Sequence, residues 1–132
     1  MEEVKVADRA QEVMKKLSAD GPKNMLSTSQ IRKFLTAVNK ITEEVNVDCI
    51  ENPDDTKLQE SLQAEIKFLK VKLAYQIARS KSKWGNPVED FAKEAKLMEE
   101  IDAIKDSIKA YRTFARYIEA LVAFHKYYGG RD

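Results

Sequence analysis

The chain has 132 residues, 43% of them hydrophobic and 34% charged, and its 23 Lys and Arg nearly balance 22 Asp and Glu to leave a net charge of +1. The length favours one domain over residues 1–132, and the small number of Gly (4) and Pro (3) residues favours helices over a β-sandwich or a disordered chain. No apolar run approaches the roughly 18 residues of a membrane span, the charged N-terminus lacks a secretory core, and Cys49 stands alone, which together predict a cytoplasmic protein.

Two helices are predicted in the first third of the chain. The first covers residues 2–18 and ends at Asp20-Gly21-Pro22, so residues 1–24 are a candidate for a loosely packed N-terminal helix. The second covers residues 29–46, where Ser27 and Gln30 have the spacing of a capping box, although Thr28 or Ser29 can also take the cap. A loop is expected over residues 46–55.

The third predicted helix runs from about residue 56 to residue 83. Its apolar residues follow helical spacing in one continuous seam, made of Leu58, Leu62, Ile66, Leu69, Leu73 and Ile77. The helix breaks at Gly85, and Asn86 followed by Pro87 restarts a helix. An unbroken helix from Pro87 to Tyr128 would be too long for a small domain, so a break is expected near Asp106-Ser107, and Gly129-Gly130 ends the last helix. The predicted fold is an all-α, compact bundle of about five helices.

The residues that catalysis needs are sparse. Cys49 and His125 are the only cysteine and the only histidine, so a zinc site of the usual type lacks ligands, and His125 is expected to be a packed or partly exposed side chain with hydrogen-bonded nitrogens. Four carboxylates share a short segment: Glu99, Glu100, Asp102 and Asp106. Three of them fall on one helix face and offer a candidate divalent-metal site. These carboxylates alternate, however, with lysines at helical spacing, which is typical of a salt-bridged, solvated face. The lysines are Lys93, Lys96, Lys105 and Lys109.

The strongest feature is a basic stretch in this nearly neutral chain. Residues 65–84 hold six basic residues and one acid. At 100° per residue, one stripe of the third helix carries Phe68, Lys72, Tyr75, Arg79 and Lys83, and Lys67, Lys70 and Lys81 lie on the other side of the apolar seam. Like charges this close repel one another, which is tolerable when a polyanion binds, so the stretch favours nucleic acid. Membranes and acidic proteins also accept basic amphipathic helices.

Three blocks of the sequence point to a family. They are SQIRKFLTAVNKI (residues 29–41), FLKVKLAYQIAR (residues 68–79) and YIEALVAFHKYYGGRD (residues 117–132). In order and spacing they resemble the small subunit of type III-A CRISPR-Cas effector complexes, the Csm family, over residues 25–132. The C-terminal block is the most specific of the three.

The resemblance implies an all-helical, non-catalytic subunit that uses no cofactor, metal or small-molecule substrate and has no membrane partner. It implies contact with the duplex of guide RNA and target RNA, with repeated backbone subunits, with a large polymerase-like subunit and with further copies of the chain. Because a guide changes its sequence, such a protein should hold the RNA backbone and leave the bases to pairing. The predicted RNA-binding residues are Arg32, Lys33, Lys67, Lys70, Lys72, Arg79, Lys81 and Lys83.

Four expectations remain beside this one. A rival function is a helical adaptor that binds an acidic protein, and a weaker one is a metal-dependent hydrolase that uses the carboxylates. Trp84, at the end of the basic stretch, is expected to pack in the core rather than to stack on a base. On the last helix, the side chains expected to be structural are Tyr111, Ile118, Leu121, Val122 and Tyr128.

Overall fold

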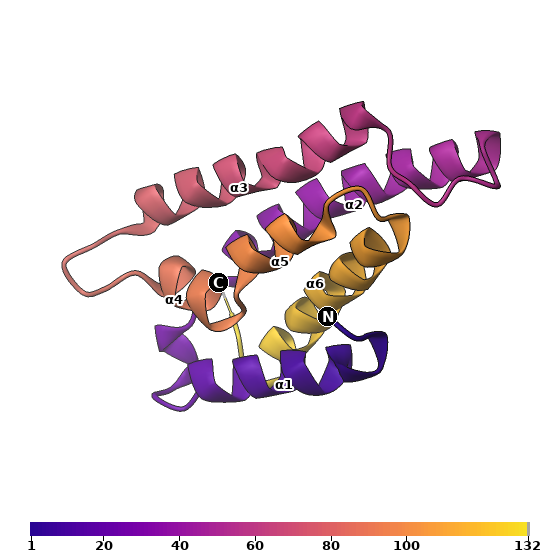
Figure 1. Ribbon diagram of the computed structural model, residues 1–132. Helices are drawn as coiled ribbons and strands as arrows, with labels where there is room; N and C mark the ends of the chain where they lie inside the picture. Colours follow the sequence, from indigo (N-terminus) through magenta and orange to yellow (C-terminus); the bar gives the residue numbers. More distant parts are fainter. Residues whose placement is uncertain (132) are drawn as a thin grey trace.

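The computed structural model describes residues 1–131 and is built from helices, as predicted. The six α-helices of the described residues are α1 (Val6–Leu17), α2 (Thr28–Glu51), α3 (Glu60–Ser80), α4 (Pro87–Glu94), α5 (Leu97–Ile104) and α6 (Ile108–Tyr127), with short 3₁₀ turns at Glu3–Lys5 and Pro22–Asn24. None of these helices is long and apolar enough to cross a membrane. In Figure 1, α2 and α3 run side by side in opposite directions, and α6 lies between this pair and α1.

Helix α1 packs against α6 and α4 and reaches α5 through Arg9. Its buried face consists of Val6, Ala10, Val13 and Met14. Arg9 extends from the same helix toward Glu100, with 3.0 Å between the guanidinium Nη1 and the carboxylate Oε1. The apolar face and this ion pair together join the N-terminal helix to the rest of the bundle.

Helix α2 begins at the predicted capping box but ends later than predicted. Ser27 Oγ accepts from the Gln30 amide at 3.1 Å, and Gln30 Oε1 accepts from the Ser27 amide at 2.7 Å, so Ser27 takes the cap. The helix continues to Glu51, through much of the expected loop. That expectation was wrong because nothing between residues 46 and 51 stops a helix, whereas Pro53 disfavours helical geometry at Asn52.

Helix α3 is shorter at both ends than the sequence predicted. Residues 56–59 are extended: the Leu58 amide donates to the Asp106 carbonyl at 2.7 Å, and the Ile108 amide donates to the Thr56 carbonyl at 3.2 Å. The backbone groups of this segment pair with the α5–α6 connection instead of with one another, so α3 begins only at Glu60. The apolar seam is buried as predicted through Leu73, and Ile77 is partly buried against the same core.

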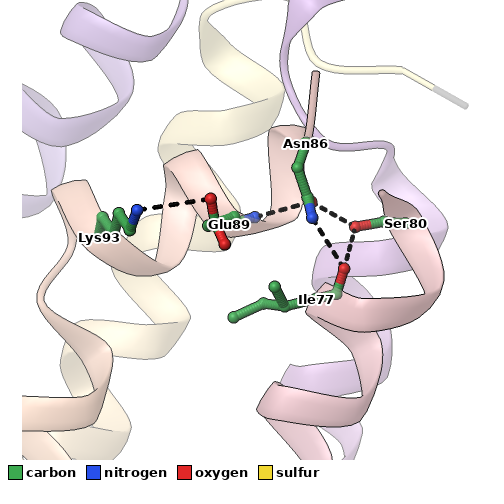
Figure 2. A network of polar contacts seen from close by, with 5 residues as sticks. All are labelled: Ile77, Ser80, Asn86, Glu89 and Lys93. Atoms are coloured by element: carbon green, nitrogen blue, oxygen red, sulfur yellow. Dashed lines mark hydrogen bonds and ion pairs between the residues drawn. The ribbon is translucent and has the colours of Figure 1, made fainter. Parts of the chain in front are cut away.

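Asn86 joins the end of α3 to the start of α4. Its Oδ1 accepts from the Glu89 amide at 3.1 Å and from Ser80 Oγ at 2.5 Å, and its Nδ2 donates to the Ile77 carbonyl at 2.8 Å (Figure 2). The predicted asparagine cap of α4 is therefore confirmed. The same side chain also satisfies a carbonyl that the end of α3 leaves free.

The segment after Pro87 contains a break that the sequence did not predict. Lys96 adopts the left-handed conformation (φ 56°, ψ 43°) and separates α4 from α5. Glycine usually occupies such a position, and a lysine there costs about 1–2 kcal/mol. Long-range partners stabilise the break: the Ala95 carbonyl accepts from Tyr117 Oη at 3.0 Å and from Arg9 Nη2 at 3.3 Å. Because both donors lie far away in the sequence, local spacing could not reveal the break.

The second break and the last helix agree with the prediction. Ser107 Oγ caps α6 by accepting from the Ala110 amide at 3.0 Å. Tyr111, Ile118 and Leu121 are almost fully buried, and Val122 and Tyr128 pack partly buried against the core. Tyr111 Oη donates to the Val38 carbonyl at 2.8 Å, and burial raises the pKa of its phenol to about 12. The burial predicted for this helix face is confirmed.

Candidate nucleic-acid interface

A groove of about 400 Å³ lies between α2 and α3. Gln76 Nε2, from α3, donates to the Gln30 carbonyl of the first turn of α2 at 2.7 Å, which fixes the two helices against each other at this groove. Phe34, a buried residue of α2, lies at the base of the groove. Local spacing could not single out Gln76, because its partner is 46 residues away.

Three of the predicted cations line this groove. Lys33 comes from α2, while Lys72 and Arg79 come from α3, two turns apart. Tyr75 stands between the α3 cations, 65% exposed, and the Arg79 guanidinium carbon lies 5.7 Å from the centre of its ring. Because α2 and α3 are neighbours, Lys33 stands at the same groove as Lys72 and Arg79. Arg32, also on α2, is exposed but does not line the groove.

Lys67 and Lys70 lie apart from the groove, on the edge of α3 that faces α5. Lys70 Nζ lies 2.8 Å from Asp102 Oδ1, and Lys67 Nζ lies 4.0 Å from the same oxygen. The hydrogen bond from Lys70 is the main cause that lowers the pKa of the Asp102 carboxyl. A counter-charge from α5 therefore stands beside these two cations, whereas on their own helix the nearest acid in the sequence is Glu65.

Beyond Lys72, a pair of carboxyl groups spans α2 and α3. Glu65 lies next to Glu44, and a hydrogen bond between the two side chains is the main cause that raises the pKa of Glu65. Lys40 and Lys72 lie close enough to oppose that shift. The groove therefore has a cationic centre and, next to Lys72, a site that loses negative charge when it takes up a proton.

The remaining basic residues belong to a tight turn between α3 and α4. The amides and carbonyls of Ser82 and Gly85 bond to each other at 3.1 and 3.2 Å, and Lys83 and Trp84 occupy the tip. Lys81, Lys83 and Trp84 are all exposed. The expectation that Trp84 packs in the core was wrong: the side chain is 86% exposed, because α3 ends at Ser80 and the turn carries the indole beyond the bundle.

The candidate catalytic groups do not assemble. Asp102 pairs with lysines of α3 and Glu100 pairs with Arg9 of α1, so their partners are long-range rather than the neighbouring lysines that the sequence suggested. Within residues 1–131 no cluster of three or more potential metal ligands occurs. His125 is buried, with Nε2 2.7 Å from the Leu26 carbonyl, which confirms the expected packed and hydrogen-bonded histidine. Cys49 is partly buried and accepts weakly from Arg112.

These features define an all-helical protein with a basic groove between α2 and α3 that also carries an exposed tyrosine. Residues 2–131 match the family described as Csm2 Type III-A. The chain therefore belongs to the Csm2 family, the small subunit of type III-A CRISPR complexes, as its sequence blocks suggested.

Curated relatives agree with this assignment. A Streptococcus thermophilus protein named "CRISPR system Cms protein Csm2" is 32% identical over 126 residues, which cover 95% of this chain and 92% of the relative. A protein of the same name from Enterococcus italicus is 33% identical over 107 residues, covering 80% of this chain and 69% of the relative. One from Mycobacterium tuberculosis is 32% identical over 107 residues, covering 81% and 78%.

Proposed function

We propose that this chain is a non-catalytic, RNA-binding small subunit of a type III-A CRISPR ribonucleoprotein and that the α2–α3 groove holds the backbone of the guide–target RNA duplex. The groove carries the proposal, because Lys33, Lys72 and Arg79 converge on it from two helices. Membership of the Csm2 family supports the assignment to such a complex. In it, the protein contacts the repeated backbone subunits, the large polymerase-like subunit and further copies of itself.

The chemistry of the groove suits phosphates better than base edges. The lysine ammonium groups act as point charges, while the Arg79 guanidinium offers a planar fork that matches two phosphate oxygens. Tyr75 lies under this guanidinium and supports its position. Such contacts hold any RNA sequence equally, which is what a complex with exchangeable guides requires.

The predicted cations then fall into groups of different importance. Lys33, Lys72 and Arg79 contact phosphates in the groove, and Lys81 and Lys83 extend the contact past the end of α3. Arg32, Lys67 and Lys70 add to the surrounding positive field at a distance from the groove. Lys67 and Lys70 contribute less than their charge suggests, because Asp102 offsets them.

The test is RNA affinity measured across a salt series for Lys72→Ala/Arg79→Ala. Each lost phosphate contact should reduce the log–log salt slope by about 0.7–0.9, so the double variant should lose about twice that amount. Its melting temperature should barely change, since both side chains are exposed. Arg79→Lys should be partly damaging, because it keeps the charge but loses the fork.

The matched control is Lys5→Ala/Lys15→Ala, which removes the same charge from the N-terminal helix region. In Figure 1, α1 lies across the bundle from α3. This control should keep the affinity and the salt slope of the parent protein. Equal losses of RNA affinity in both double variants would mean that only net charge matters, and they would refute RNA binding by the groove. Salt-insensitive binding to an acidic protein, with no RNA binding, would favour the adaptor function instead.

A further inference from the structure

We infer that Trp84 is a stacking platform for an unpaired RNA base, presented by the turn of residues 82–85 at the end of the groove. This inference rests on the proposed RNA-binding function and adds to it a specific ligand: a nucleotide whose base is free of pairing. A base inside a duplex is covered on both faces by its neighbours. A protruding indole can therefore stack only on an unpaired or terminal base, which has an open face.

The exposure of Trp84 is the first observation. The side chain is 86% exposed, and it is the single tryptophan of the chain. Tryptophan is the largest apolar side chain, and leaving it in water forgoes the stabilisation that burial would bring. Its position at the tip, beyond the end of α3, therefore calls for an external partner with a flat apolar face.

The turn fixes the backbone that carries the indole. The paired backbones of Ser82 and Gly85 close the turn, and Ser82 Oγ accepts from the Trp84 amide at 3.2 Å. Gly85 adopts φ 125°, a conformation that other residues rarely take, so the turn depends on glycine there. Next to Gly85, the Asn86 side chain joins the segment that leaves the turn to the last turn of α3 (Figure 2). A backbone that is already ordered loses little further entropy when the indole stacks on a base.

The charges around Trp84 favour an anionic partner, and among polyanions RNA also offers flat bases for stacking. The Lys83 ammonium lies 4.9 Å from the centre of the indole ring, and Lys81 is exposed nearby in the chain. No acidic residue occurs between Glu65 and Glu89, so the turn lies within the longest acid-free segment of the sequence. Arg79 and Ser80, which line the groove, directly precede the turn. An RNA backbone in the groove thus brings its bases within reach of Trp84.

The experiment uses the intrinsic fluorescence of the full chain, since all tryptophan emission comes from Trp84. The probes are an oligouridylate, which stays unpaired, and inorganic polyphosphate of matched charge, which has no bases. Oligouridylate should strongly quench the emission, while polyphosphate should bind and leave it nearly unchanged. Trp84→Ala should weaken oligouridylate binding roughly 5- to 150-fold, the range that one base–aromatic stack provides, and Trp84→Phe should recover most of the loss.

Each outcome separates this inference from the proposed function. Unchanged oligouridylate affinity in Trp84→Ala, or equal quenching by polyphosphate, would overturn base stacking. If Lys72→Ala/Arg79→Ala still lost affinity in that case, phosphate binding by the groove would stand. Failure of the parent protein to bind RNA even at low salt would overturn both. Because Trp84 is exposed, Trp84→Ala should melt like the parent, and the affinity comparison is made on folded protein.

Discussion

The Lys70 ammonium lies 2.8 Å from the Asp102 carboxylate, and this ion pair separates the basic residues of α3 into two edges. On one edge, Lys67 and Lys70 face a counter-charge on α5. On the other, Lys72 and Arg79 line the groove against α2. Residues that follow one another in a single basic stretch of sequence therefore stand in different electrostatic surroundings.

A comparison of Lys70→Ala with Lys72→Ala tests this division. Both changes remove one positive charge from α3, two residues apart, so the net charge is the same. Lys72→Ala should weaken RNA binding and reduce the salt slope by about 0.7–0.9, whereas Lys70→Ala should change both much less. Binding titrations over a salt series provide the measurement. Equal losses would show that the ion pair with Asp102 does not keep Lys70 away from RNA.

Glu65→Gln should strengthen RNA binding at neutral pH, because it removes a negative charge beside Lys72. Contact with Glu44 raises the pKa of Glu65 above the ordinary value of 4.5. In the parent protein, affinity should therefore rise as the pH falls toward this raised pKa and Glu65 takes up its proton. Glu65→Gln should show less of this rise. The measurement is RNA affinity against pH for both proteins, and identical pH profiles would rule the effect out.

The Glu65–Glu44 pair also determines how the stability of the fold depends on pH. The pKa of Glu65 is higher in the folded protein than in the unfolded chain. Its contribution to folding is therefore most favourable at a pH below the unfolded-state pKa, and it is lost as the pH rises through the folded-state pKa. At neutral pH the two carboxylates repel each other, so Glu65→Gln should slightly raise the melting temperature there. The difference between the two proteins should vanish in acid.

Leu121→Ala should destabilise the fold without affecting the RNA surface. Leu121 is fully buried on α6, and such truncations cost about 2–5 kcal/mol of unfolding free energy. The surface truncation Ile50→Ala, at a side chain that is 79% exposed, is the control and should change stability little. Denaturant unfolding and RNA affinity are measured on both. A Leu121→Ala protein that melts normally but binds no RNA would contradict the structural role.

Gly130→Ala should disturb the packing of His125. A β-carbon at residue 130 would overlap the imidazole ring, which is held by the Leu26 carbonyl at 2.7 Å. Moving the ring leaves that carbonyl without its partner, so we expect a loss of about 1–3 kcal/mol in a thermal melt. Lys126→Ala, an exposed change on the same helix, is the control. A Gly130→Ala protein as stable as this control would mean that the chain end moves away from His125 at no cost.

The sequence by itself determined the helical class, the apolar seam of α3 and the cap at Asn86, and it placed the other two caps to within two residues, at Ser27–Ser29 and at Asp106-Ser107. These features depend on residues within one or two turns of each other, and such spacing can be recognised in the sequence. The C-terminal block also pointed to the Csm2 family. The basic residues were found in the same way, because charge is visible without coordinates.

Only the tertiary structure decided which of these charges work together. Asp102 and Lys70 are 32 residues apart, and Gln76 meets a carbonyl 46 residues away. The break at Lys96 likewise depends on Tyr117 and Arg9, which reach the Ala95 carbonyl from other helices. The end of α3 at Ser80 puts Trp84 in solvent rather than in the core. In each case the deciding contact joins distant parts of the chain, and packing, not local propensity, sets its geometry.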